Sequence, residues 1–224
     1  MRHFVQARSQ SLTMVVLAIL LMQSEISYNT AYGALAGSLP GLDESVLPTA
    51  GLVLRAVLAL ALVVLWLLNG KRALFKLIIV VNGLLTFGLI TNLAALIAVL
   101  FGLRPQIVRE LLADVVLMAI ANILIYSIWY WIIDPPGVEE NPHEDKAWEF
   151  LFPQRAGDVP RYEAWLPRYS DYLYLAFTTS FAFSPTDTLP LTRRAKMLML
   201  LQASVSLITI TGIAGSAINM LAGS

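Results

Sequence analysis

The feature that most constrains this chain is a set of long segments that lack charged side chains. One of them, residues 77–103, runs for 27 residues without an Asp, Glu, Lys or Arg. The hydrocarbon core of a bilayer is about 30 Å thick and takes roughly 20 apolar helical residues to cross. This run therefore predicts one tilted membrane span. Four other segments are comparably apolar, so the sequence predicts five spans at 9–28, 46–69, 77–103, 115–133 and 197–221.

The composition agrees with an all-α integral membrane protein. Hydrophobic residues make up 58% of the chain and charged residues 13%, whereas soluble domains are about half apolar and a quarter charged. This excess excludes a soluble enzyme, a nucleic-acid-binding protein and a disordered tail. Fifteen basic residues balance fifteen acidic ones, so the net charge indicates no partner, and the expected surroundings are the lipid bilayer, with no nucleic acid.

Catalytic and metal-binding signatures are not expected. The chain has no cysteine, which excludes a disulfide framework and a thiolate nucleophile. His3 and His143 lie far apart in polar segments, and no histidine–carboxylate or Ser/His/Asp set falls at membrane depth. We therefore expect neither a cofactor nor an enzymatic activity.

The first span has two interpretations. Arg2 and Arg8 precede it and Ala34-Leu35-Ala36 follows it, as in a cleaved signal peptide. The small-residue site lies about a dozen residues beyond the apolar run, which is too far for a usual cleavage. A retained span is favoured over cleavage.

The chain divides into three predicted regions. Residues 1–134 form a four-span helical region, which ends at Asp134-Pro135-Pro136 because no helix continues through that sequence. The aromatic run Trp129-Tyr130-Trp131 is typical of an interface anchor. Residues 135–170 form a polar interfacial loop with a short helix at 143–150, and residues 171–224 hold a short apolar helix, a loop and the last span.

The segment 172–183 is too short to cross a bilayer. Its twelve mostly apolar residues lead directly into Ser184-Pro185-Thr186-Asp187. A short helix at 172–181, a break and a full span together predict a re-entrant segment, which survives at membrane depth only when it is buried in protein or lines water. A helix lying flat in the interface is an equal alternative on periodicity alone.

Lys and Arg residues set the predicted orientation. With the N-terminus in the cytoplasm, twelve of the fifteen basic residues fall on the cytoplasmic side, and only Arg55, Arg104 and Arg109 fall outside. The positive-inside rule therefore predicts a cytoplasmic N-terminus and an external C-terminus.

The stretch 171–221 resembles the two-helix pore module of tetrameric potassium channels. The run YLYLAFTTSFAF stands where the pore helix would be, and LPLTRRAKMLMLL opens the inner helix. The filter position holds Ala182, Phe183, Ser184, Pro185, Thr186 and Asp187. It lacks the glycines that turn successive carbonyls toward one axis, so the resemblance does not imply potassium selectivity. The charge pattern also places this module facing the cytoplasm, inverted relative to those channels.

The same half of the chain resembles a family of bacterial inner-membrane proteins without an assigned activity. The matching residues are 172–179 and 182–191, together with Trp129-Tyr130-Trp131, Asp134 and the run FLFPQ at 150–154. This resemblance implies a multi-pass protein of the bacterial inner membrane and implies no function.

Three sets of residues are candidates for function. Asp187 is interpreted either as one member of a carboxylate ring that attracts a cation in an oligomer or as a cap before the last helix. Arg55 lies at membrane depth and is expected either to pair with Glu25 or Asp114, to snorkel to the headgroups or to relay protons. Small and polar residues also form a stripe on the last helix, interpreted as a wet pore lining or as helix packing: Gln202, Ser206, Thr209, Gly212, Ser216 and Asn219.

Two functional hypotheses follow. The first is a channel-like pore, weakly selective or not selective for potassium, formed by a homo-oligomer that is a tetramer if it is a pore. The second is a non-conducting structural or signalling subunit whose re-entrant loop binds a partner. A monomer would exclude the first hypothesis, because one copy of the module cannot enclose a path.

Overall fold

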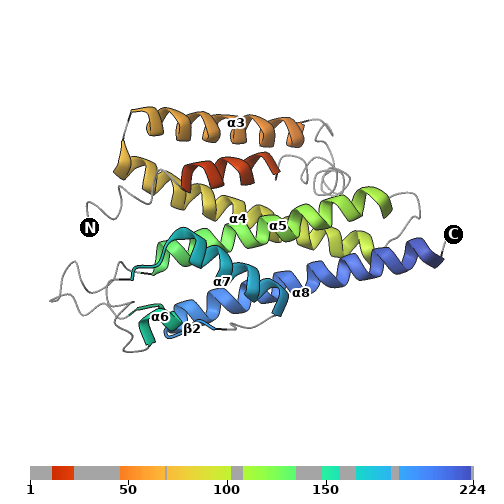
Figure 1. Ribbon diagram of the computed structural model, residues 1–224. Coiled ribbons are helices and arrows are strands. Elements are labelled where there is room, and N and C mark those ends of the chain that lie inside the picture. The colour runs from red at the N-terminus through yellow and green to blue at the C-terminus, as the bar shows by residue number, and fades with distance from the viewer. Residues whose placement is uncertain are drawn as a thin grey trace. The chain divides into compact units, whose positions relative to one another are not determined.

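The computed structural model describes residues 12–22, 46–68, 70–101, 108–134, 148–156, 165–182 and 187–222. This described part is largely helical (Figure 1). Three of its helical segments are long and apolar enough to cross a membrane: Lys71–Ala94, Val115–Ile133 and Arg193–Gly212. The helical membrane-protein class predicted from the sequence is supported to this extent.

The long helices coincide with predicted spans but begin earlier in three cases. The helices are α3 (Val46–Leu67), α4 (Lys71–Phe101), α5 (Val108–Ile133) and α8 (Arg193–Ala222). The first two predicted spans correspond to shorter apolar helices, Leu12–Met22 and Gly51–Leu67. Helix α5 ends at Ile133, directly before the Asp-Pro-Pro sequence that was predicted to stop it.

The chain forms two compact units, Met1–Ala121 with Ile208–Ser224, and Asn122–Leu207. In the first unit, one face of α4 supplies a buried apolar row. The row follows the i, i+3, i+4 spacing of a helix face and consists of Leu74, Ile78, Val81, Leu85 and Leu89.

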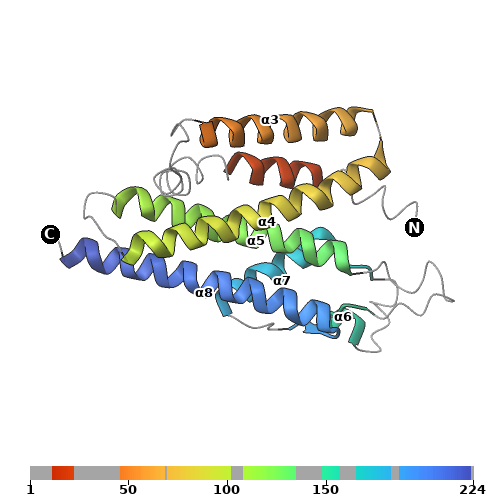
Figure 2. The ribbon, with the colours of Figure 1, turned by 180° about the vertical axis from the view of Figure 1, so that it is seen from behind.

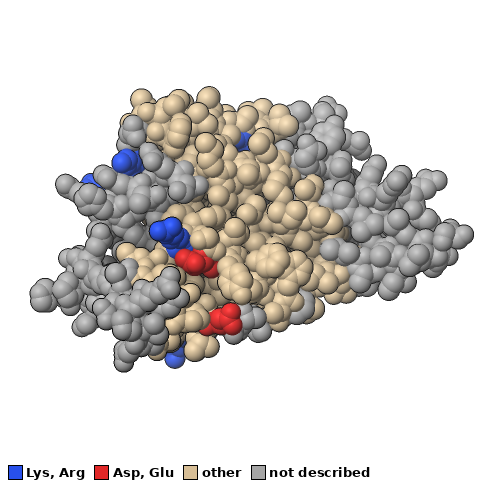
Figure 3. All heavy atoms as spheres, viewed as in Figure 1, with Lys and Arg blue, Asp and Glu red and all other residues tan. Residues whose placement is uncertain are grey.

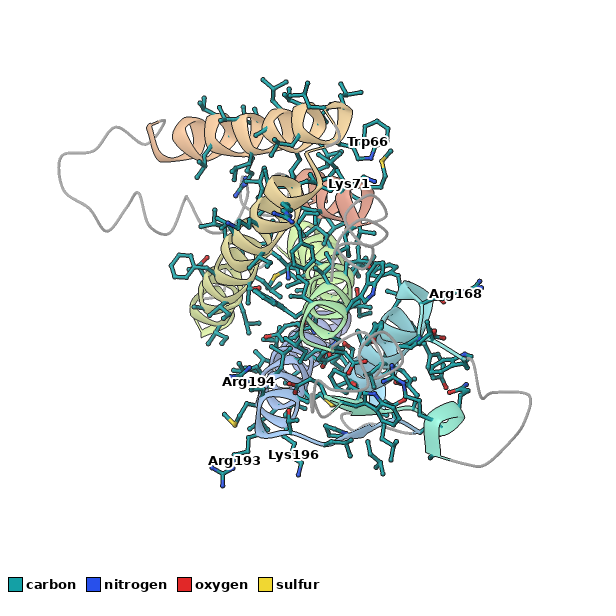
Figure 4. All side chains as sticks on the ribbon, turned by 90° about the vertical axis from the view of Figure 1, so that its left-hand side faces the viewer. Trp66, Lys71, Arg168, Arg193, Arg194 and Lys196 are labelled. Atoms are coloured by element: carbon teal, nitrogen blue, oxygen red, sulfur yellow. The ribbon has the colours of Figure 1, made fainter. Side chains whose placement is uncertain are left out.

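A tight turn joins α3 to α4. The Gly70 amide donates to the Leu65 carbonyl at 3.0 Å, and the Leu74 amide donates to the Gly70 carbonyl at 2.9 Å. The bond from Gly70 to Leu65 spans five residues, as does the 6→1 bond of a Schellman motif that commonly ends a helix. The bond from Leu74 to Gly70 begins α4. Trp66 and Lys71 flank the turn (Figure 4).

The outer surface of α3 is apolar. Leu52, Val53, Leu54, Val57 and Leu60 are all exposed. On the face drawn in Figure 3, most of the described surface carries neither a basic nor an acidic side chain. A surface of this kind matches lipid tails, which are as apolar as leucine.

The second unit contains the end of α5, the short strands β1 (Phe150–Leu151) and β2 (Leu189–Pro190), α6 (Pro153–Ala156), α7 (Tyr169–Ala182) and the start of α8. The short helix α7 lies beside the first half of α8 in both ribbon views (Figures 1 and 2). The strands pair antiparallel, with Phe150 opposite Pro190 and Leu151 opposite Leu189.

The prediction of a helix at 143–150 is wrong at its C-terminal end. Residues 143–147 lie outside the described part of the chain, and Phe150 belongs to β1. The amides of Glu149 and Phe150 donate to the Asp134 carboxylate. They are therefore not available for the i−4 carbonyls that a helix would require.

Candidate functional site

Helix α7 begins at a side-chain cap. The Arg168 amide donates to Asp171 Oδ2 at 2.6 Å, so a carboxylate in the first turn satisfies a donor that the helix leaves unpaired. The short helix predicted at 172–181 lies within α7, which starts three residues earlier.

The Asp134 carboxylate joins four segments of the second unit. Its Oδ1 accepts from the amides of Glu149 at 3.0 Å and Phe150 at 3.4 Å. Its Oδ2 accepts from Arg155 Nη1 at 3.2 Å and from the Tyr172 hydroxyl at 2.5 Å. Asp134 is fully buried, so a charge placed just after α5 is neutralised by α6 and bonded to β1 and α7.

The partner of this carboxylate, Arg155, lies among aromatic rings. Its side chain is 5% exposed, and its guanidinium carbon lies 4.7 Å from the ring centre of Trp148, 5.7 Å from Phe152 and 6.0 Å from Trp165. Buried ion pairs depend on such compensating contacts, because both charges have left water.

Gln202 on α8 forms the second polar junction. Its Oε1 accepts from the Tyr130 hydroxyl of α5. Its Nε2 donates to the Ala176 carbonyl at 2.7 Å and to Ser180 Oγ at 2.8 Å, both on α7. The side chain is 0% exposed, so both ends of the amide are bonded inside a single protomer.

The other described residues of the predicted polar stripe are also buried. Ser206 Oγ accepts from Asn122 Nδ2 at 2.7 Å, and Thr209 and Gly212 are also buried. The side chains of Ser216 and Asn219 lie outside the described part. For Gln202 and Ser206, these bonds favour the packing interpretation over the wet lining.

A different face of α8 is exposed, although the sequence pattern did not predict it. Its members recur at helical spacing on the side opposite Gln202. Serine, threonine and glycine are mixed there with large apolar residues, so the face follows neither a purely polar nor a purely apolar pattern. The face consists of Met197, Leu200, Ser204, Leu207, Thr211 and Gly215.

The filter-like segment is described only at its two ends. Phe183, Ser184, Pro185 and Thr186 lie outside the described residues, while Ala182 ends α7 and is exposed. Asp187 is exposed as well, and its Oδ2 accepts from the Tyr174 hydroxyl at 3.4 Å.

Thr192 is the residue that caps α8. Its Oγ1 accepts from the Ala195 amide at 3.2 Å, and its hydroxyl donates to the Glu149 carboxylate. Thr192 therefore caps the first turn of α8, and the interpretation of Asp187 as a cap of the preceding turn stays a prediction. Arg193 and Lys196, just after this cap, are exposed and point outward (Figure 4).

The chain enters and leaves the α7 segment at the same end of the α5–α8 pair. The hydroxyl of Tyr169, at the start of α7, is hydrogen-bonded to Ser127 Oγ at 2.8 Å, and its ring packs on Trp131 near the end of α5. Burial raises the pKa of Tyr169, an effect that the Ser127 hydrogen bond opposes. After α7, the Leu191 amide donates to the Glu149 carbonyl, which returns the chain to the Asp134 end.

From this end, α7 extends along α8 as far as Gln202. Gln202 lies nine residues after Arg193, about 14 Å along the helix at the 1.5 Å rise of each residue. The second unit thus contains a short helix that extends partway along two longer ones.

The intramembrane charges are only partly described. Arg55 lies on α3 and is half-buried, whereas the side chains of Glu25 and Asp114 fall outside the described part. Pairing of Arg55 with either carboxylate stays a prediction.

Within the described residues, no group of three or more His, Cys, Asp or Glu side chains could hold a metal ion. The chain matches no family model, no curated protein and no solved structure. The resemblances to a pore module and to a bacterial inner-membrane family therefore rest on the quoted residues alone.

Proposed function

We propose that this chain is a channel-like, multi-pass protein of the bacterial inner membrane, with five spans, a cytoplasmic N-terminus and an external C-terminus. In this proposal 169–192 is a re-entrant segment, and copies of the second unit surround a weakly selective path. The observation that carries the proposal is the return of the chain to the Asp134 end after α7. A short helix held between two longer ones is the arrangement of a pore module.

The proposed path runs along the exposed face of α8. Gln202 and Ser206 are bonded to α5 and α7 inside the protomer, so they cannot also face an axis between subunits. Ser204, Leu207 and Thr211 are exposed, and in this proposal they line such an axis. Exposed Asp187 from each copy would form a carboxylate ring that attracts a cation.

A non-conducting structural or signalling subunit is the second candidate. Its supporting observation is the burial of Gln202 with both ends of its amide bonded. A polar network closed in this way stabilises a fixed packing of helices and requires no permeant ion. Under this proposal the exposed faces of α7 and α8 contact a partner.

Reconstitution separates the two candidates. The purified chain is analysed for subunit number in mild detergent and for cation flux in liposomes. We expect an oligomer that conducts cations, with less flux after Asp187→Asn and a block after Ser204→Trp. Gln202→Leu, two residues from Ser204, is the matched control for a change on the buried face of α8. It should lower thermal stability, because the Tyr130 and Ser180 hydroxyls lose their bonds to Gln202. A monomer, or an oligomer without flux, would reject the pore.

A further inference from the structure

Within the described part of the chain, two buried polar side chains one helical turn apart on α5 each have an atom without a hydrogen-bond partner. These atoms are Asn122 Oδ1 and the Tyr126 hydroxyl oxygen. Both residues are 1% exposed, and both fall inside the candidate span Val115–Ile133. Lipid tails offer no hydrogen bonds there, so the groups must be satisfied from within the protein.

The geometry of a helix brings these two side chains together. Residues four apart occupy the same face, and long side chains lean toward the N-terminus over the preceding turn. Tyr126 therefore lies over the turn that carries Asn122. Ser206 of α8 adds a third group, because its Oγ accepts from Asn122 Nδ2 at 2.7 Å and its own hydrogen remains available.

We infer that Asn122, Tyr126 and Ser206 bind an enclosed water molecule between α5 and α8. The water donates to Asn122 Oδ1 and accepts from the Tyr126 and Ser206 hydroxyls, which gives it the two to four bonds typical of buried water. Turning the Asn122 amide exchanges its oxygen and nitrogen, yet one amide atom and the Tyr126 hydroxyl still need a partner.

The chemistry of the unpartnered atoms selects water over an ion. A monovalent cation would contact both oxygens but would leave the Tyr126 hydrogen unbonded. Chloride would accept from Tyr126 and from a turned Asn122 amide, but it would place an uncompensated charge inside an apolar span, which costs far more than a neutral water molecule. Water is both donor and acceptor, and it satisfies both atoms whether or not the protein conducts.

The sign of one stability change tests this inference. If the Tyr126 hydroxyl is unbonded, Tyr126→Phe removes a buried unsatisfied group and leaves the chain as stable or more stable. If the hydroxyl binds water, Tyr126→Phe lowers the midpoint of thermal unfolding. Tyr130→Phe, which loses a direct bond to Gln202, is the positive control. Tyr174→Phe, which loses only an exposed 3.4 Å contact with Asp187, is the control for which little change in the midpoint is expected.

Two measurements on the unsubstituted chain decide the question even if Tyr126→Phe does not fold. Radiolytic hydroxyl labelling should modify Tyr126 at a dose that spares Tyr172, which is equally buried but bonded to Asp134. Equal protection of the two tyrosines would overturn the inference. So would a loss of thermal stability of the Asp187→Asn chain when sodium and potassium are replaced by choline, because that variant lacks the proposed Asp187 ring and the result would identify a cation bound elsewhere.

Discussion

At the scale of single residues, Asp134 shows how little of a site a sequence reveals. Followed by two prolines, it reads as a helix stop, and α5 does end there. The structure adds contacts with Glu149, Phe150, Arg155 and Tyr172. Those partners lie 15 to 38 residues away, and no local pattern specifies which buried donors a carboxylate will meet.

We predict that Asp134→Ala destabilises the second unit strongly. Removing one member of a buried ion pair leaves the other charge uncompensated, at a cost of about 3–5 kcal/mol. Asp187→Ala is the control, because Asp187 is exposed and exposed substitutions usually change stability by about 0.5 kcal/mol or less. Denaturant unfolding, followed by tryptophan fluorescence to which Trp148 and Trp165 beside Arg155 contribute, measures both. Equal losses of unfolding free energy in the two variants would contradict the prediction, because the buried pair would then stabilise the unit no more than an exposed side chain does.

At the scale of elements, apolar length and proline placement predicted the helices well. The short helix at 172–181 and the helix end before Pro135 follow directly from local sequence. The pairing of β1 with β2 could not be predicted in this way, because each strand has two residues and its partner lies about 40 residues away. Such contacts depend on tertiary packing and not on propensity.

The proposed re-entrant course of α7 predicts a pattern of chemical labelling. The chain has no cysteine, so single cysteines at Arg168, Phe181 and Asp187 report without background. An impermeant thiol reagent applied from the cytoplasmic side should modify positions 168 and 187 quickly and position 181 slowly, because only 181 lies at membrane depth. Similar rates at all three positions would place α7 flat in the interface and contradict the re-entrant course.

At the scale of the whole molecule, periodicity identified the polar face of α8 but not its surroundings. Gln202 and Ser206 lie on one side of the helix, as their spacing requires, and they are bonded to α5 and α7. A stripe of small polar residues looks the same in sequence whether it meets water or another helix. The outcome depends on which helices pack there, and that information is distributed over the chain.

Topology provides a prediction at this scale. The excess of basic residues on one side places Glu140 in the cytoplasm and Asp43 outside. Cysteines introduced at these two positions should therefore respond oppositely to an impermeant reagent in intact cells, with position 43 modified and position 140 protected. Modification of position 140 with protection of position 43 would reverse the orientation of the chain.

The two attachments of α7 have a mechanical consequence. Tyr172 fixes one part of the helix to Asp134, and Gln202 fixes another part through Ala176 and Ser180. Because α7 is bonded at two separate points, it can neither slide along α5 and α8 nor turn about its own axis without breaking a buried hydrogen bond. A displacement of α7 that keeps these bonds must therefore carry the end of α5 and the start of α8 with it.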